Sequence, residues 1–406
     1  MIASLADLLH PVTPERFFAE YYDRQPLHVR GGAEKFASVL SWRQINRLLD
    51  MTHIWTSTSL KLVLDSAAVP PEQFCTRAAG RDGGQVLQPD ARLVQGWIAK
   101  GASVVMNDVD SLTPGLAAVS NALEGAGLGK SQANVYISWQ SHKAFHTHYD
   151  THDVWAVQVE GEKAWNIWEG RAEWPIAHPV FRGQPQAHHD QARGRLREKV
   201  VLKTGDLLYL PRGWYHDALA EAPSSVHVAY GVHAPLGMDL MNMLVERVLY
   251  EPEFRKPLPR QDGTAPAKFA LTQRAGLLGQ RIAELCRDPK VLEVLERFVA
   301  DYRYRRGGFD ILAARGLGSA AGAGTGDAPA FRVVAGGAKP VRRGADWVLK
   351  GSAGALALSP PEAEAAAWLL ARPDVTAAEL AAAHPGVDAE ALIGRLAGAG
   401  LLVAAA

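Results

Sequence analysis

Only two cysteines occur in the 406 residues, Cys75 and Cys286, and they are far apart and in no metal-binding spacing. This scarcity argues against a disulfide framework and favours a reducing compartment. The sequence also lacks any apolar run near the ~20 residues that a membrane-spanning helix needs. Its N-terminus has neither the basic start nor the apolar stretch of a signal peptide. We therefore expect a soluble protein of the cytoplasm with no membrane partner.

An excess of one charge sign is absent as well. Lys and Arg together number 43, and so do Asp and Glu, so the net charge gives no indication of a nucleic-acid partner. The hydrophobic content of 48% and the charged content of 21% are ordinary for a globular protein. Because 406 residues exceed the usual size of one compact domain, two or three domains are expected.

The segment from about 132 to 235 has the composition of a β-barrel. Its runs NVYISWQ, DVWAVQVEGEKAWNIW, KVVL, DLLYLP and SVHVAYGVH are rich in Val, Tyr, Trp and Ile and are separated by Gly, Pro or polar turns. Residues 160–163 indicate a hairpin turn, and a polar insertion at about 171–198 interrupts the strands. An antiparallel barrel is the natural interpretation. Residues 1–130 mix helical and strand signals.

Beyond the barrel the sequence becomes helical. Apolar residues recur at i, i+3 and i+4 within 238–306, and a Gly- and Ala-rich piece at 315–328 is typical of a flexible linker. After it come strand-like FRVVA, DWVLK and LLVA and three short helical runs, in an order typical of a winged-helix unit. The predicted divisions are a barrel domain with its N-terminal extension at 1–235, a helical segment at 236–312, a linker at 313–330 and a winged-helix-like domain at 331–406.

The pattern His148-Tyr149-Asp150 lies just before the apolar strand VWAVQV. A non-haem iron centre binds its metal through two imidazoles and one carboxylate on one face and keeps other positions open. Because residues i and i+2 of an extended backbone point the same way, His148 and Asp150 can supply two of these ligands. A second such pattern, His188-His189-Asp190, lies in a polar, Gln- and Arg-rich stretch with no strand on either side. We interpret it as a solvated loop.

The third ligand should come from a later strand of the same barrel. In GDLLYLPRGWYHDALA, a strand and a Pro-Arg-Gly turn are followed by His216 at the start of the next strand. A buried structural histidine is the alternative interpretation of His216. We expect His146 and His152 to surround the site or line the substrate pocket rather than to bind the metal. The other histidines considered are His178, in the insertion, and His227 and His233, in the last strand.

These segments together resemble a known family. HYDTHDVWAVQVEGEKAWNIW, GDLLYLPRGWYHDA and SSVHVAYGVH are similar to the JmjC ribosomal oxygenases, also called cupin-4 proteins, and FAEYYDRQPLHVRGG is similar to that family's N-terminal signature. The resemblance implies a mainly β core, a cupin-like JmjC double-stranded β-helix, with N-terminal α/β elements, a helical middle segment and a C-terminal winged-helix domain. It implies a homodimer formed through the helical segment. It also implies an Fe(II)- and 2-oxoglutarate-dependent dioxygenase that hydroxylates a protein side chain.

The resemblance also assigns roles to individual residues. It implies that the two histidines and the aspartate named above bind Fe(II), and that Lys163 holds the distal carboxylate of the cosubstrate 2-oxoglutarate. A buried dicarboxylate needs a cationic partner, and a Lys that follows an apolar strand can supply it. A solvated hairpin lysine is the alternative. Asn134 and Tyr136 correspond to family positions that line the same pocket, although alternate residues of a barrel strand face inward in any case. No further catalytic residue is expected.

The substrate is less well specified than the site. The resemblance favours a ribosomal protein, and Lys rather than Arg at position 163 favours hydroxylation of histidine over arginine. The chain departs from the eukaryotic relatives in the stretch before the motif, which is Pro-rich in them and SWQSHKAF here. Because this loop borders the mouth of the site, a hydroxylase of a small peptide or metabolite is an alternative. A lysine demethylase fits less well, since the relatives that the chain most resembles are hydroxylases.

Two alternatives belong to other classes of protein. One is a transcriptional regulator that reads DNA through the winged helix and carries a metal-binding cupin. Residues 351–406 contain six acidic and two basic residues, a net charge of −4, whereas phosphate contacts need the opposite sign. We therefore expect no direct DNA binding, and expect this module to bind protein or pack. The other alternative is a cupin that holds a metal without catalysis, which has no use for a dicarboxylate clamp at Lys163.

Overall fold

The structure is a computed structural model that describes residues 2–80, 84–139, 145–220, 223–307, 330–334, 338–343, 346–351, 354–372 and 374–404. The chain divides into two compact units, Met1–Arg306 and Gly307–Ala406. The predicted linker at 313–330 lies outside the described residues except for Ala330. Among the described residues, no helix combines the length and the apolar character that crossing a membrane requires.

Short helices and strands precede the barrel in the first unit. The helices and 3-10 turns before and within the barrel are α1 (Leu5–Leu9), α2 (Pro14–Glu20), α3 (Trp42–Asp50), η1 (Thr52–Ile54), η2 (Pro71–Gln73), α4 (Ala91–Ala99), α5 (Pro114–Gly125), α6 (Pro179–Arg182) and α7 (Gln186–Ala192). The strands are β1 (Leu27–Val29), β2 (Leu60–Leu64), β3 (Ala67–Ala68), β4 (Cys75–Ala79), β5 (Gln85–Pro89), β6 (Ser103–Met106), β7 (Lys130–Trp139), β8 (Asp153–Glu160), β9 (Glu162–Arg171), β10 (Leu196–Lys203), β11 (Leu207–Leu210), β12 (Trp214–Ala220) and β13 (Ser224–His233).

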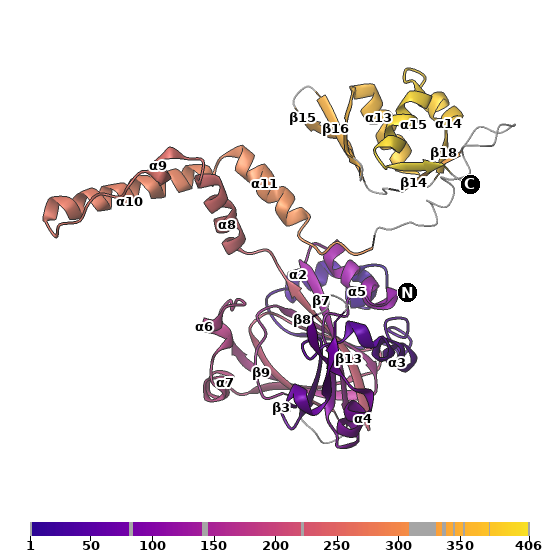
Figure 1. Ribbon diagram of the computed structural model, residues 1–406, viewed down its shortest axis with the longest axis vertical. Helices are drawn as coiled ribbons and strands as arrows, with labels where there is room; N and C mark the ends of the chain where they lie inside the picture. The colour runs from indigo at the N-terminus through magenta and orange to yellow at the C-terminus, as the bar shows by residue number, and fades with distance from the viewer. Residues whose placement is uncertain are drawn as a thin grey trace. The chain divides into compact units, whose positions relative to one another are not determined.

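Two antiparallel sheets confirm the predicted barrel. The larger has the order β1-β11-β8-β13-β7-β6-β2-β3 and the smaller the order β10-β9-β12. Figure 1 labels β3, β7, β8 and β13 of the larger sheet and β9 of the smaller. Because successive side chains of a strand point to opposite faces, β8 turns Val154 and Ala156 toward the core between the sheets and Trp155 and Val157 toward the outer core. The side chains that fill the space between the sheets are Val154, Ala156, Trp165, Ile167, Val200, Leu202, Leu208, Leu210 and Trp214.

The N-terminal helices cover the outer face of the larger sheet. Helix α2 begins at Pro14, and its cap residue Thr13 accepts a hydrogen bond from the Arg16 N–H. The ring of Phe17 lies 5.1 Å from that of Trp155 and 4.9 Å from that of Tyr209. This aromatic contact fixes the N-terminal extension to β8 and β11.

The insertion between β9 and β10 is ordered, and it corrects one prediction. His188, His189 and Asp190 belong to helix α7, not to a loop. Pro185 precedes the helix, and α6 lies just before it, so the polar composition of this stretch reflects exposed short helices rather than a lack of structure. The insertion packs beside the predicted metal-binding motif, because the Tyr149 hydroxyl donates to the carbonyl of Phe181 at 2.6 Å.

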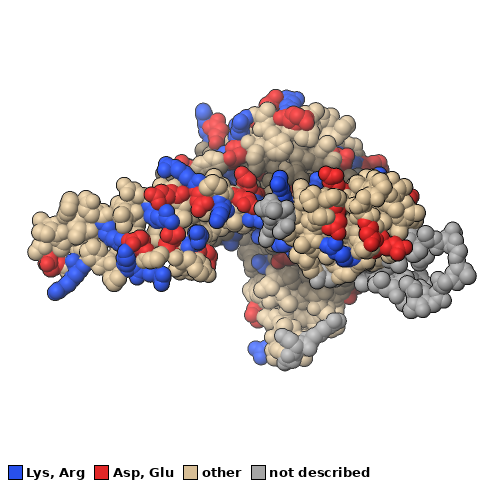
Figure 2. Space-filling view, turned by 90° about the horizontal axis from the view of Figure 1, so that it is seen from above, with Lys and Arg blue, Asp and Glu red and all other residues tan. Residues whose placement is uncertain are grey.

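The predicted helical segment projects from the barrel domain (Figure 1) and consists of α8 (Gly237–Val248), α9 (Pro252–Arg255), α10 (Ala265–Leu285) and α11 (Pro289–Ala300). Within residues 237–300 only Leu244 and Leu285 are buried. Figure 2 shows acidic and basic side chains beside one another along this projection, with uncharged surface between them. The exposed large apolar side chains include Met238, Met241, Val245, Leu249, Tyr250, Phe269, Leu277, Leu292, Val294 and Val299.

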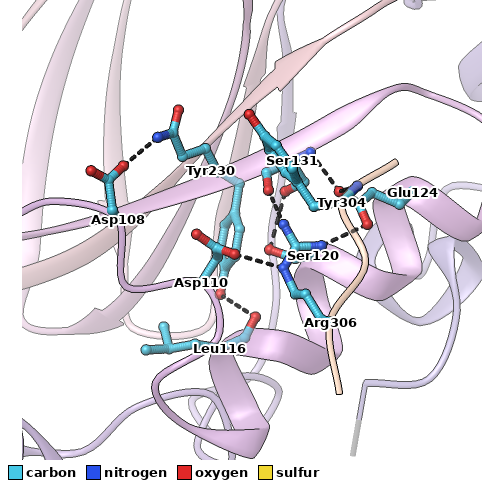
Figure 3. A network of polar contacts seen from close by, with 10 residues as sticks. Asp108, Asp110, Leu116, Ser120, Glu124, Ser131, Tyr230, Tyr304 and Arg306 are labelled. Atoms are coloured by element: carbon cyan, nitrogen blue, oxygen red, sulfur yellow. Dashed lines mark hydrogen bonds and ion pairs between the residues drawn. The ribbon is translucent and has the colours of Figure 1, made fainter. Parts of the chain in front are cut away.

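The chain returns from α11 to the barrel domain and is fixed there by Arg306 (Figure 3). Its guanidinium donates to Asp110 and to Glu124 of α5, each at 2.6 Å, and to the carbonyl of Ser131. The Arg306 and Glu124 side chains are 5% and 3% exposed. Since Glu124 also accepts from the main-chain N–H of Tyr304, both ends of the helical segment are attached to the same domain.

The second unit has its own core. Its helices are α13 (Pro360–Leu370), α14 (Ala377–Ala383) and α15 (Ala389–Gly398), and its strands are β14 (Ala330–Val333), β15 (Val341–Arg343), β16 (Asp346–Gly351), β17 (Gly354–Leu358), β18 (Asp374–Thr376) and β19 (Leu402–Ala404). One antiparallel sheet has the order β18-β14-β19 and another the order β15-β16-β17. The three helices and the strands β14, β16 and β19 lie where the sequence predicts them, whereas β15, β17 and β18 were not anticipated.

Candidate metal centre and cosubstrate pocket

The three predicted metal ligands lie together at one end of the barrel. His148 and Asp150 precede β8, and His216 lies on β12. The main chains of His148 and His216 exchange two hydrogen bonds, at 3.0 and 2.9 Å, as an isolated antiparallel bridge. Directly opposed residues on adjacent strands present their side chains to the same face. The bridge therefore brings together two imidazoles that are far apart in the sequence, and Asp150 joins them by its i, i+2 spacing.

The distances fit one metal ion. The Oδ2 atom of Asp150 lies 3.5 Å from Nε2 of His216 and 4.0 Å from Nε2 of His148. Two ligands that each lie about 2.1 Å from an ion are at most about 4.2 Å apart, and both separations meet this limit. Among the described residues, this is the group of three His, Cys, Asp or Glu side chains whose ligand atoms all lie within 4.8 Å of one another.

The hydrogen bonds of the two histidines favour metal binding through Nε2. Nδ1 of His148 lies 2.8 Å from the carbonyl of His146, and Nδ1 of His216 lies 2.9 Å from the carbonyl of Trp214. A carbonyl can only accept, so each Nδ1 carries the proton and each Nε2 presents its lone pair to the centre. Both imidazoles are thus held in the tautomer and orientation that a metal ligand needs.

The protonation of the site also suits a metal. Burial, and then the neighbouring His148, lower the pKa of His216 to about 4, so its imidazole is neutral near pH 7. Burial acts to raise the pKa of Asp150, but the neighbouring side chains of His152, His148, His216 and Arg182 outweigh it and hold that pKa below its ordinary value. A neutral imidazole and an ionised carboxylate are the forms that bind metal ions.

A cavity of about 330 Å³ opens beside these ligands. Alternate residues of β7, β9 and β13 point into it, as expected for the interior of a barrel. Its lining residues are Gln132, Asn134, Tyr136, Phe145, His148, Asp150, His152, Val154, Lys163, Trp165, His216, Ala218, His227, Ala229 and Gly231. The predicted cosubstrate residues Lys163, Tyr136 and Asn134 are therefore in one cavity with the predicted metal ligands.

Lys163 is a buried cation with neutral neighbours. Its side chain is 3% exposed, its Nζ donates to Oγ of Ser138 at 3.2 Å, and Nδ1 of His227 lies 3.5 Å away. No acidic side chain among the described residues forms a salt bridge with it. Burial lowers the pKa of Lys163 to about 7. The solvated-hairpin alternative for Lys163 is wrong, because the side chain points into the barrel.

The β7 residues form the wall opposite Lys163. The ring of Tyr136 stacks on that of His227 with centroids 4.8 Å apart and an angle of 6°. Burial raises the pKa of Tyr136 to about 12, so its hydroxyl keeps its proton and can donate. The side-chain oxygen of Asn134 accepts from the main-chain N–H of Asp108 at 3.1 Å. His227, which the sequence presented as a ligand candidate, lies beside Lys163 and away from the three-residue group.

The remaining candidates take other places. His152 lines the same cavity without joining the ligand group, and His146 contributes its carbonyl to His148. His178 caps α6, accepting at Nδ1 from the N–H of Val180. His142 lies outside the described residues.

A second cavity, of about 240 Å³, meets the first at the predicted metal ligands. The insertion helices form one of its walls, which the sequence did not predict. It is lined by His148, Tyr149, Asp150, Thr151, His152, Phe181, Arg182 and His189. Arg182 donates to the Thr151 hydroxyl at 3.4 Å. The ligand pair His148 and Asp150 thus borders one cavity inside the barrel and another beneath α6 and α7.

The JmjC domain family matches residues 118–240, the part of the chain that contains strands β7 to β13 and the three predicted ligands. Relatives include the bifunctional lysine-specific demethylase and histidyl-hydroxylase NO66 of Drosophila persimilis, 28% identical over 63% of this chain and 36% of that protein. Ribosomal oxygenase 1 of Danio rerio is 26% identical over 62% of this chain and 45% of that protein. The chain is therefore a homologue of the NO66 and ribosomal oxygenase proteins, and its matched part spans less than half of their length.

The solved structure of the Escherichia coli ribosomal oxygenase YcfD shares the fold. It covers 97% of this chain and 98% of its own, with a TM-score of 0.52 and 16% sequence identity. YcfD is also known in complex with cobalt and succinic acid, with a TM-score of 0.52, and with cobalt and 2-oxoglutarate, with a TM-score of 0.51. The predicted JmjC fold is thereby confirmed.

Proposed function

We propose that this protein is an Fe(II)- and 2-oxoglutarate-dependent oxygenase that hydroxylates a protein side chain. The observation that carries the proposal is Lys163, a buried ammonium group that has no acidic partner among the described residues. It lies in a cavity that also contains two imidazoles and a carboxylate in metal-binding arrangement. A buried cation is costly unless an anion joins it, and a dicarboxylate cosubstrate supplies that anion. The JmjC match and the cobalt and 2-oxoglutarate complexes of YcfD support this assignment.

The proposed metal ligands are His148, Asp150 and His216. Two imidazoles and one carboxylate are the ligand set of non-haem iron oxygenases and leave positions open for other ligands. Bound Fe(II) would supply the redox chemistry that couples decarboxylation of 2-oxoglutarate to hydroxylation of a C–H bond. The protein's own contribution is to orient both imidazoles through Nδ1, to pair Lys163 with the far carboxylate and to keep the cavity dry.

Tyr136 and Asn134 are proposed to line the cosubstrate. The Tyr136 hydroxyl remains protonated and can share the carboxylate with Lys163. Its ring, held flat against His227, fixes the direction of that hydroxyl. Two cavities meeting at His148 and Asp150 support an enzyme over a cupin that only stores a metal, because cosubstrate and substrate can approach the ion from different sides.

A ribosomal protein is the proposed substrate, and histidine the favoured target. The names of the relatives, ribosomal oxygenase and histidyl-hydroxylase, support this choice. The NO66 name also includes a lysine demethylase, so demethylation joins hydroxylation of a small peptide or metabolite as an alternative. A substrate on the ribosome would place the protein in the cytoplasm.

The other modules keep the proposed roles. We infer that α8–α11 pairs with a second copy, which the exposed apolar side chains of this segment support. The order α13, β18, α14, α15, β19 supports the winged-helix proposal for the second unit. In this unit Arg395 bonds Glu362, and Arg372 stacks 3.6 Å over the ring of Trp368. Both arginines of residues 351–406 are thus engaged within the unit.

Turnover of 2-oxoglutarate to succinate tests the cosubstrate assignment. Lys163→Ala should raise the Michaelis constant for 2-oxoglutarate by at least about 100-fold, since removing one partner of a buried charge pair costs about 3–5 kcal/mol. Lys203→Ala is the matched control, because this lysine of the neighbouring strand β10 is 67% exposed and pairs with Glu162. Equal Michaelis constants for the two variants would refute Lys163 as the clamp.

Mass spectrometry of host ribosomal proteins tests the substrate. A +16 Da modification should be present in cells with the gene, absent without it, and restored by the wild type but not by His148→Ala. A ribosome without any such difference would refute a ribosomal substrate and favour the peptide or metabolite alternative.

A further inference from the structure

The metal-binding motif is not part of a regular strand. In residues 145–152, all of which the structure describes, the only ladder contact is the bridge between His148 and His216. A segment with so few backbone hydrogen bonds does not hold its side chains in place by secondary structure alone. Metal ligands nevertheless need a fixed geometry, so other contacts must position this segment.

Thr147 and Asp217 supply the first of these contacts. They directly flank the bridged pair and turn their side chains away from the metal, because neighbouring residues of an extended chain alternate in direction. The Thr147 hydroxyl donates to Oδ2 of Asp217 at 2.8 Å. Each residue is 3% exposed. The segments that carry His148 and His216 are therefore joined by the Thr147–Asp217 hydrogen bond as well as by their main-chain bridge.

Asp217 connects this pair to the smaller sheet. Its Oδ1 accepts from the Asn166 side-chain amide and its Oδ2 from the Trp168 indole N–H, each at 3.0 Å. Both donors lie on β9, in which Asn166 is the register partner of Asp217. A buried carboxyl with three side-chain donors has a strongly fixed position, so Asp217 ties Thr147 to the barrel wall.

Both ends of helix α7 also contact Thr147. Gln186, its first residue, donates to the Thr147 carbonyl at 3.0 Å. Arg193, which caps its C-terminal end, donates to the Thr147 hydroxyl at 3.0 Å and lies 4.0 Å over the ring of Trp168. The insertion, Thr147 and Asp217 thus form one connected set of contacts behind the metal ligands.

We propose that Thr147 and Asp217 are positioning residues and that α7 is a brace, a helix whose contacts hold Thr147 in place. Together they raise the affinity of the centre for its metal ion. This inference rests on the proposed iron site, but it concerns groups that do not touch the ion. Without the brace, the 145–152 segment must be ordered when the metal binds, and that ordering reduces the affinity. Loss of contacts of this kind behind a metal ligand typically costs 10–100-fold in metal affinity.

The test is Co²⁺ binding by the full-length metal-free protein, measured by visible absorption and calorimetry. Thr147→Val, which keeps the shape and removes the hydroxyl, should bind Co²⁺ about 10–100-fold more weakly. Thr147→Ser should stay within about threefold of the wild type, because it restores the hydroxyl. Arg193→Gln, which changes a residue at the surface end of α7, should bind Co²⁺ about tenfold more weakly than the wild type. This second variant keeps the test decisive if the Thr147 variant fails to fold.

Thr204→Val is the matched control. It removes a hydroxyl that donates to the Gly161 carbonyl in the same unit, and its Co²⁺ affinity should equal that of the wild type. If Thr147→Val and Arg193→Gln both bind Co²⁺ as tightly as Thr204→Val, the brace is refuted while the metal centre stands. If the wild type binds Co²⁺ no better than His148→Ala, the metal centre itself is refuted.

Discussion

Nζ of Lys163 lies 3.5 Å from Nδ1 of His227, and both side chains are 3% exposed. Burial, and then the charge of Lys163, lower the pKa of His227 well below its ordinary value. His227 is therefore neutral, and it neither adds a second positive charge to the pocket nor neutralises the first. Of these two groups, Lys163 is therefore the one that gains or loses a proton near neutral pH, with a pKa of about 7.

This pKa predicts that binding of 2-oxoglutarate depends on pH. The bound dicarboxylate favours the ammonium form, so it raises the pKa of Lys163, and above pH 7 the ligand-free protein must take up a proton on binding. The association constant should be level below about pH 7 and fall by up to about tenfold per pH unit above it. Calorimetry of the cobalt-loaded protein in two buffers of different ionisation enthalpy should give about one proton taken up at pH 8.

Lys163→Arg separates this effect from protonation of the metal ligands. Arginine remains charged at all of these pH values, so the variant should take up no proton on binding, whatever its affinity. Equal proton uptake by the wild type and Lys163→Arg would mean that another group titrates and that Lys163 is already charged in the free protein.

Substitutions in the two similar patterns, His148-Tyr149-Asp150 and His188-His189-Asp190, should give opposite results. His148→Ala, Asp150→Ala and His216→Ala should each abolish turnover of 2-oxoglutarate to succinate, because each removes one of three metal ligands. His188→Ala should retain turnover, since this exposed side chain belongs to α7 and lies outside the ligand group. Succinate release at saturating Fe(II) is the measurement. Loss of activity in His188→Ala with retention in His148→Ala would reverse the assignment of the motifs.

The barrel and the pairing of His148 with Asp150 could be predicted from the sequence, because both depend on local strand patterns. Strand alternation makes His148 and Asp150 neighbours on one face, and that spacing is readable from the chain. Thr147 and Asp217, which contact each other, are 70 positions apart in the sequence. It follows from the register of the His148–His216 bridge, which no local pattern encodes.

The insertion was harder to predict than the barrel. Helices α6 and α7 are short and largely exposed, so they lack the apolar periodicity by which a helix is recognised. Their importance lies in side-chain contacts such as those of Gln186 and Arg193 with Thr147. The tryptophan Trp168 likewise carries no signal of its own, although its indole N–H bonds Asp217.

Arg306 should contribute strongly to the stability of the first unit. Arg306→Ala would leave Glu124 and Asp110 without their buried cation, and breaking such a pair costs about 3–5 kcal/mol. We expect a marked fall in the free energy of unfolding of the barrel domain, measured by chemical denaturation. Arg303→Ala is the control, because this arginine is 56% exposed and pairs with Asp301 at the surface. A loss of stability no larger than that of Arg303→Ala would show that the contacts in Figure 3 do not fix the helical segment.

The helical segment α8–α11 should join two copies of the chain. Within residues 237–300 only two side chains are buried, whereas Leu249 and Phe269 are 56% and 64% exposed. Apolar surface of this extent on one projection indicates an interface, and a two-fold pair is the commonest closed assembly. Light scattering at micromolar concentration should therefore give twice the chain mass of 43.8 kDa.

Substitutions can locate that interface. Leu249→Glu and Phe269→Glu should shift the assembly toward monomers, because each would bury a charge without a partner. Val180→Glu is the matched control: Val180 is 61% exposed but lies on α6, outside the helical segment, so this variant should remain dimeric. A wild-type mass near 43.8 kDa would exclude the dimer, and a dimer that survives both substitutions in α8–α11 would place its interface elsewhere.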